Sequence, residues 1–278
     1  MGRLERLGLA ALASVGLVAI PAIAAGYATP GSSFAIVGQV VAGDAELTAK
    51  NNGTLTELKA RPVSAVTLGA AIPSATSELF GAKADAPFDT TRTLYGWPER
   101  PGLYCDLLRT RGLGLSTACL RDVDNDGRFD EGRRFDFNSG FGDLLGITPS
   151  GKIIGVRTTA RPLPVPLPQP VPYTVGNVPS EVTGRLALKW RKINLADTAA
   201  AQLWLTTPDN YTGTEGLSEQ VVQFPFTRAP LDVELYGIKL RVLGFDEKGA
   251  MRYRLVEIRD GTMVPLKFRG YTFRIMII

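Results

Sequence analysis

The stretch from Cys105 to Asp136 constrains the fold of this chain most, because it holds both cysteines and the densest acidic group in the sequence. Aspartates at alternate positions, a closing glycine and a later aspartate form its acidic run: Asp122, Asp124, Asp126, Gly127 and Asp130. A tight loop can point alternate carboxylates inward together, and a glycine supplies the positive φ that turns the chain around an ion. The pattern predicts a calcium-binding loop, since Ca²⁺ takes six to eight oxygen ligands.

In this interpretation the three alternating aspartates bind the ion through their carboxylates. The backbone carbonyl of Arg128 is the next ligand, and Asp130 binds directly or through water. Over about a dozen residues the run resembles the loops of EF-hands, dockerins and thrombospondin type 3 repeats. It departs from them at the twelfth position, where Arg133 replaces an acidic residue. Glu131 or Asp136 could supply the missing ligand, but neither has the expected spacing. We therefore expect weak binding, with a Kd on the order of 10⁻⁴ to 10⁻³ M, and a structural role for the calcium. The alternative is a solvated acidic turn, because Asp, Asn and Gly are ordinary turn residues.

The two cysteines, Cys105 and Cys119, bracket a glycine-containing loop. In an exported protein such a pair is expected to form one disulfide. Closing a loop of about 15 residues stabilises a fold by roughly 3 kcal/mol. The alternative, a pair of free redox thiols, lacks the CxxC spacing. The bridge would end shortly before Asp122 and would anchor one end of the acidic loop.

The N-terminus has the pattern of an export signal. Two basic residues, Arg3 and Arg6, precede an apolar run from Leu7 to Ile20, and a small-x-small cleavage site follows at residues 22–24. We therefore predict a signal peptide over residues 1–24 and a periplasmic or extracellular location. The apolar run is short for a membrane span, so we expect no transmembrane segment in the mature chain, with a retained anchor as the alternative.

The rest of the chain is predicted to be mostly β, as two small antiparallel domains, each a sandwich or a partly open barrel. Prolines alternate with other residues from Pro162 to Pro172. Because proline donates no backbone hydrogen bond, this run should exclude a helix and a central strand. We expect an extended linker over 161–173 between an N-terminal domain (25–160) and a C-terminal domain (174–278).

The C-terminal part favours a three-strand meander with turns at 246–249 and at Asp260-Gly261. This meander would place Arg241 opposite Arg254, Arg254 opposite Lys267 and Arg252 opposite Arg269. One face would then carry a basic row: Arg241, Arg252, Arg254, Lys267 and Arg269. Like charges on neighbouring strands repel one another, so the row predicts a polyanion-binding face. The expected partners are an acidic polysaccharide, lipopolysaccharide or an envelope protein. The alternative is neutralisation within the fold by Asp232 and Glu234.

The composition excludes several kinds of chemistry. The chain has no histidine, which removes Ser-His-Asp and Cys-His triads and histidine-based zinc sites. A net charge of +4 in an exported chain does not indicate nucleic-acid binding. We expect a non-catalytic, calcium-binding β protein with a structural or binding role in the cell envelope or outside the cell. The alternative is a carbohydrate-active enzyme, a carboxylate-based hydrolase or lyase with a structural calcium.

Overall fold

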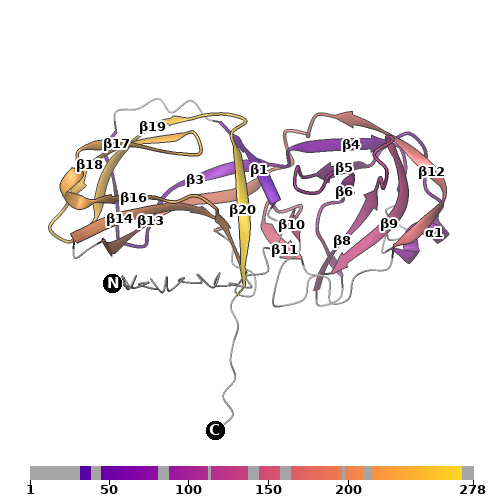
Figure 1. The fold of residues 1–278 in the computed structure, drawn as a ribbon, viewed down its shortest axis with the longest axis horizontal. Coiled ribbons are helices and arrows are strands. Elements are labelled where there is room, and N and C mark those ends of the chain that lie inside the picture. The colour runs from indigo at the N-terminus through magenta and orange to yellow at the C-terminus, as the bar shows by residue number, and fades with distance from the viewer. Residues whose placement is uncertain are drawn as a thin grey trace, which may run out of the picture.

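The structure is a computed structural model, and it confirms the mostly β, antiparallel fold. Two closed six-stranded sheets lie side by side (Figure 1). The predicted signal peptide over 1–24 lies outside the described residues. The structure describes residues 32–38, 45–80, 88–111, 114–136, 144–156, 164–195, 198–208 and 214–270.

The first closed sheet takes strands from both ends of the chain. In order around the ring these are β13 (Gly184–Leu195), β3 (Thr54–Arg61), β1 (Ser32–Val37), β20 (Met263–Gly270), β15 (Thr214–Ser218) and β14 (Thr198–Thr206). Pairing of β13 with β14 closes the ring. The strand β16 (Val222–Pro225) adds to β14, and a 3-10 turn follows at Phe226–Arg228.

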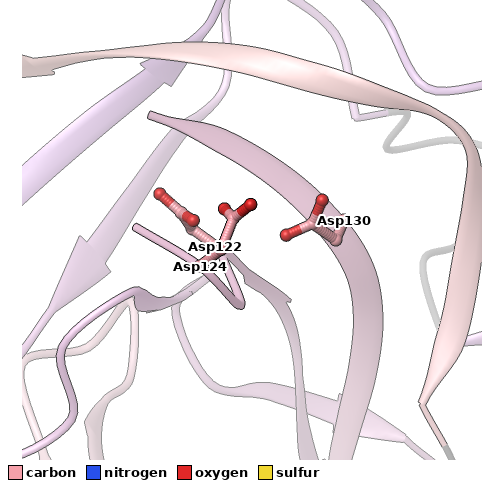
Figure 2. A group of neighbouring side chains, drawn as sticks. All are labelled: Asp122, Asp124 and Asp130. Carbon is pink, nitrogen blue, oxygen red and sulfur yellow. The ribbon is translucent and has the colours of Figure 1, made fainter. Parts of the chain in front are cut away.

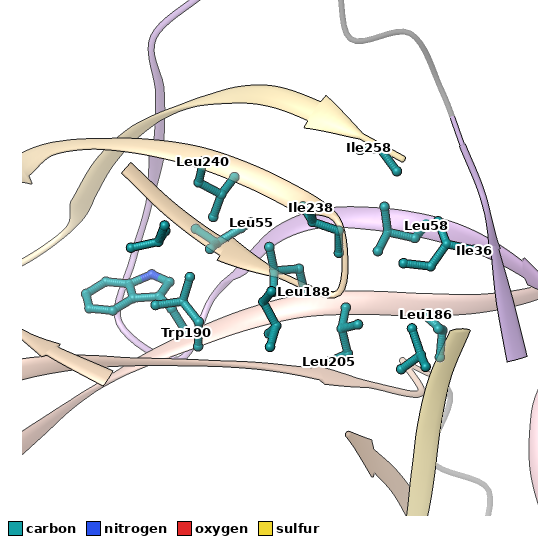
Figure 3. Close-up of a cluster of buried hydrophobic side chains, with 14 of the residues drawn as sticks. Ile36, Leu55, Leu58, Leu186, Leu188, Trp190, Leu205, Ile238, Leu240 and Ile258 are labelled. Atoms are coloured by element: carbon teal, nitrogen blue, oxygen red, sulfur yellow. The ribbon is translucent and has the colours of Figure 1, made fainter. Parts of the chain in front are cut away.

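A four-stranded sheet packs against the first closed sheet. Its strands are β17 (Leu231–Leu235), β18 (Ile238–Phe245), β19 (Met251–Ile258) and β2 (Leu47–Ala49). The alternation of apolar and polar residues buries one side of each strand. Figure 3 shows the shared core, in which Leu188 and Trp190 of β13 face Ile238 and Leu240 of β18. This core makes the first closed sheet and its cover one packing unit.

The second closed sheet is built from the middle of the chain. In order around the ring its strands are β6 (Leu103–Cys105), β5 (Thr93–Gly96), β4 (Ser64–Leu68), β12 (Val165–Gly176), β9 (Arg128–Asp136) and β8 (Gly114–Arg121). Pairing of β6 with β8 closes the ring, and β7 (Arg109–Arg111) adds to β8. One helix, α1 (Ser74–Leu79), lies at this end of the molecule (Figure 1).

The predicted disulfide between Cys105 and Cys119 is confirmed. The two residues lie directly opposite each other in the β6–β8 pair, and both are fully buried. The disulfide therefore links β6 and β8 covalently, the two strands whose pairing closes the second sheet. It ends two residues before Arg121, the last residue of β8, after which the acidic loop begins.

A hairpin connects the two closed sheets through its side chains. It consists of β10 (Leu144–Ile147) and β11 (Ile153–Val156), with Gly151 at a positive φ in the turn. Ile147 and Ile153 belong to the core of the first closed sheet, whereas Ile154 packs with the disulfide in the second. The hairpin therefore packs between the two closed sheets and contributes side chains to the cores of both.

The predicted linker over 161–173 is wrong, because residues from Val165 onward form β12. Val165 and Pro172 pair with β9, whereas Tyr173 to Gly176 pair with β4. Along its proline-rich part the strand thus pairs on one side only, at residues 165, 166, 171 and 172, with a register shift between Pro166 and Val171. Backbone N–H groups along a strand point alternately to its two sides. The proline positions face the side without a paired strand, where no hydrogen-bond donor is needed. The prolines within the strand are exposed, and Leu167 and Val171 are buried.

The domain boundaries also differ from the expected ones. Strands β1 to β3, which were assigned to the N-terminal domain, pair with strands of the C-terminal part. The second closed sheet is therefore an insertion between β3 and β13. The first pairing of the predicted meander, β18 with β19, is confirmed, but the second is wrong, because β19 pairs next with β2, whereas β20 pairs with β1 and β15. The Asp260-Gly261 turn joins two different sheets.

Candidate metal centre

Three of the four predicted aspartates come together in the loop between β8 and β9. Carboxylate oxygens of Asp122, Asp124 and Asp130 all lie within 4.8 Å of one another (Figure 2). Asp122 follows the last residue of β8, Asp124 lies in the loop, and Asp130 is the third residue of β9. Such a group of oxygen donors could hold a metal ion, and hard divalent cations prefer these donors.

Backbone hydrogen bonds shape the loop around Asp122. The N–H of Asp126 donates to Asp122 Oδ1 at 3.2 Å, and the N–H of Gly127 donates to Asp122 Oδ2 at 3.0 Å. The N–H of Val123 donates to Asp130 Oδ2 at 2.8 Å. Gly127 has a φ of 86°, the left-handed conformation that glycine adopts without strain. Asp124 and Asp130 each accept one such bond and keep lone pairs for an ion, because a carboxylate offers about four acceptor positions.

Gly102, a residue that the sequence reasoning missed, supports the loop from the adjacent turn. Its carbonyl accepts a hydrogen bond of 2.9 Å from the N–H of Asp122. Its φ is +74°, and a Cβ atom at this position would overlap the carbonyl oxygen of Asp122. A glycine is therefore required here both for conformation and for space. Its place before β6 carried no motif that could have revealed this role.

Tyr173 was also missed, and it contacts the most buried carboxylate of the group. Its hydroxyl donates to Asp122 Oδ2 at 2.9 Å, and its ring stacks on Phe129 with 4.4 Å between the ring centroids. Asp122 is 2% exposed. Burial raises the pKa of Asp122, but hydrogen bonds from Tyr173 and the loop backbone together outweigh burial and leave the pKa below its usual value. Asp122 is therefore held in its charged form.

The pKa of Tyr173 moves in the opposite direction. Burial is the largest cause of the raised pKa of Tyr173, and the hydrogen bond to Asp122 and the charge of that carboxylate raise it further. The hydroxyl consequently keeps its proton and stays a donor to Asp122. Tyr173 belongs to β12, so the proline-rich strand positions one side of the acidic loop.

The other predicted ligands have different partners. Asp126 is exposed, and its Oδ1 accepts a hydrogen bond of 2.8 Å from the backbone N–H of Arg128. Arg133, at the twelfth position of the pattern, forms an ion pair of 2.6 Å with Glu131. Glu131, a possible replacement for the missing acidic ligand, therefore already has a cationic partner. The side chain of Asp136, the other possible replacement, lies outside the described part of the chain.

The predicted basic row is divided between two sheets. Arg241 lies opposite Arg254 as predicted, but Lys267 belongs to β20 in the first closed sheet. The side chain of Arg269 lies outside the described residues. Acidic partners accompany the row: Asp232 for Arg241 at 2.7 Å, Glu46 for Arg252 at 3.4 Å and Glu219 for Lys267 at 3.2 Å. Neutralisation within the fold thus accounts for these three cations.

Comparison of the chain with known family models, curated proteins and solved structures gives no match. Within the described ranges, no helix is long and apolar enough to cross a membrane.

Proposed function

We propose that the protein is an exported, non-catalytic β protein whose acidic loop binds calcium and that it has a structural or binding role in the cell envelope or outside the cell. The observation that carries this proposal is the close grouping of the Asp122, Asp124 and Asp130 carboxylates. Three negative charges this close repel one another, and a divalent cation among them removes that cost. The signal-like N-terminus supports export. The carbohydrate-active enzyme stays a prediction.

Calcium fits this loop better than magnesium. Magnesium demands a near-ideal octahedron and sheds its water reluctantly, whereas calcium accepts six to eight oxygens in irregular geometry. Asp124 is exposed and Asp130 is half-buried, so water can complete the coordination shell. With few protein ligands, we expect a Kd on the order of 10⁻⁴ to 10⁻³ M.

The place of the loop in the fold favours a structural role for the ion. The loop joins β8 to β9, and its first residue follows the strand that carries Cys119. The disulfide fixes one end of this region, and the contact between Asp122 and Tyr173 ties the loop to β12. A bound cation would join three segments of one closed sheet and would stabilise the folded state by mass action.

The test is calcium titration of the oxidised protein. Isothermal calorimetry measures the affinity, and thermal unfolding with calcium or with chelator measures the stabilisation. We expect millimolar calcium to raise Tm and Asp124→Ala to abolish the rise. Asp124 suits this test because its carboxylate makes one long hydrogen bond, 3.3 Å to the N–H of Asp126. Removing it should disturb the apo fold little.

Asp126→Ala is the matched control, since it removes one carboxylate from the same loop. The carboxylate of Asp126 accepts a hydrogen bond from the N–H of Arg128 and lies outside the group of three carboxylates. We therefore expect the calcium response of this variant to persist, with at most a several-fold weaker affinity. Equal loss in both variants would mean that Asp126 is a ligand too, as the sequence pattern predicted. No calcium response in the wild-type protein would refute the proposal and favour the solvated turn.

A further inference from the structure

A second basic surface, which the sequence did not single out, lies on the outer side of the first closed sheet. On β13 and β3, the residues that point inward build the core, among them Leu58, Leu186 and Leu188. Their neighbours along each strand point outward, because successive side chains of a strand alternate between the two faces. Five of these outward residues are cationic: Lys59, Arg61, Arg185, Lys189 and Arg191. We call them the β13–β3 basic face.

The strand register places these cations along one stripe, in which Glu57, opposite Ala187, lies between Arg185 and Lys189. Arg185 lies directly opposite Lys59, a pairing of like charges that is unfavourable without a compensating anion. Lys189 and Arg191 continue the stripe along β13. From Arg185 to Arg191 the strand advances by six residues, which corresponds to about 20 Å. An extended polyanion could therefore contact several cations at once.

Counter-charges are fewer here than in the row that the sequence indicated. Arg61 forms an ion pair of 3.9 Å with Asp260, and Glu57 adds one carboxylate to the outer side of β3. Among the described residues, neither Lys59 nor Lys189 has a carboxylate partner. At Lys59 and Lys189 an anion would therefore gain contacts without displacing an existing carboxylate.

An aromatic side chain lies beside the stripe. Trp204 of β14 is directly opposite Lys189, and its ring lies 5.5 Å from the guanidinium of Arg191. It is partly exposed, whereas Trp97 and Trp190 are buried. Gln202, next to it on the same side of β14, accepts a hydrogen bond of 2.6 Å from Arg191 Nε. An indole face, an amide and adjacent cations are suited to a sugar ring that carries an acidic group.

We propose that the β13–β3 basic face binds a linear acidic polysaccharide, with Trp204 stacking on one sugar ring and the cations pairing with carboxylates along the polymer. A nucleic acid is the competing polyanion. It is less favoured, since its binding surfaces present successive aromatic rings for base stacking and this stripe has one such ring. The inference is independent of the calcium loop, which belongs to the other closed sheet.

The test uses the full mature chain and polygalacturonate, a linear polymer of an acidic sugar. Because Trp204 is the exposed tryptophan, binding should change the intrinsic fluorescence, and calorimetry gives the affinity. We expect Lys189→Glu/Arg191→Glu to weaken binding about tenfold or more, and Trp204→Ala to weaken it several-fold and to remove the fluorescence change. Raising the ionic strength from about 0.02 M to about 0.3 M should weaken wild-type binding, because salt screens exposed charges.

Arg241→Glu/Arg252→Glu is the matched control, with the same change in net charge on the four-stranded sheet. It should retain affinity within about twofold, and neutral dextran should not bind. Should Lys189→Glu/Arg191→Glu fail to fold by circular dichroism, Lys59→Glu tests the same face at an exposed position. Three results would overturn the inference: no binding of polygalacturonate, equal loss in the two double variants, or equally tight binding of single-stranded DNA.

Discussion

Asp122 is the residue on which the geometry of the acidic loop depends. It is nearly inaccessible to water, yet its two oxygens accept hydrogen bonds from two backbone amides and one hydroxyl. A buried carboxylate stays charged only when donors or cations replace the lost water. The protein therefore fixes one negative charge at the base of the loop even before any cation arrives, and Tyr173 is the one side-chain donor to it among the described contacts.

The variant Tyr173→Phe tests this role, because it removes the hydroxyl and keeps the ring that stacks on Phe129. We expect the free energy of unfolding at pH 7, in chelator, to fall by about 1.5–3 kcal/mol, the usual range for a hydrogen bond to a charged group. The pKa of Asp122 should rise at the same time, since burial would be less opposed. Urea unfolding at several pH values measures both effects.

The sign of the pH dependence follows from the lowered pKa of Asp122. A carboxyl group whose pKa is lower in the folded state stabilises the protein above its unfolded pKa, and this stability is lost as the pH falls through the folded pKa. The difference between wild type and Tyr173→Phe should therefore shrink on acidification to about pH 3. Tyr236→Phe removes a hydroxyl that accepts a hydrogen bond from Gln220, and its effect should not change with pH. A constant difference for Tyr173→Phe would contradict the contact.

At the scale of elements, β12 shows how a proline-rich run can serve as a strand. Its prolines share one side of the backbone, and Leu167 and Val171 share the buried side. A run with prolines at every second position therefore keeps the donors that its single ladder needs. The apolar character of the intervening residues was the signal in the sequence that a solvated linker does not explain.

Two neighbouring substitutions distinguish a packed strand from a linker. Leu167 belongs to the core of the second closed sheet, so we expect Leu167→Ala to lower the free energy of unfolding by about 2–4 kcal/mol. Pro168 is exposed, and Pro168→Ala should cost less than about 1 kcal/mol, through the greater freedom of the unfolded chain. Chemical denaturation of both variants gives the comparison. Two small effects would indicate that the segment does not pack in solution.

The sequence predicted local features well and long-range pairing poorly. The disulfide and the turn at 246–249 between β18 and β19 follow from local spacing. The pairing of β20 was missed because an Asp-Gly turn looks the same whether the next strand stays in its sheet or enters another. The contact of Tyr173 with Asp122 spans 51 residues, so no local pattern contains it.

At the scale of the whole molecule, the chain leaves the first closed sheet after β3 and returns to it at β13. The entry and exit of the inserted sheet lie side by side, since Ala65 of β4 pairs with Gly176 of β12. A unit whose ends meet can be inserted into another with little strain. The inserted part also holds its own core clusters, the disulfide and the acidic loop. The proline run is therefore the last strand of this unit.

This topology predicts which fragments of the chain fold alone. A fragment of residues 62–178 contains all six strands of the second closed sheet, so we expect the oxidised fragment to unfold cooperatively in urea. It should be less stable than the intact protein, because Tyr95 would lose its contact with Val182 and the β10–β11 hairpin would expose Ile147 and Ile153. It should also keep any calcium response of the intact protein.

The matched control is the fragment of residues 174–278, which is the C-terminal domain predicted when the proline run is taken as a linker. It lacks β1 and β3, which lie between β13 and β20 in the ring. Without these two strands the first closed sheet stays open, and its core residues Leu186 and Leu266 lose the partners that cover them. We expect this fragment to show no cooperative transition and poor dispersion of its amide resonances. Cooperative folding of 174–278 together with failure of 62–178 would restore the boundary at the proline run and contradict the insertion.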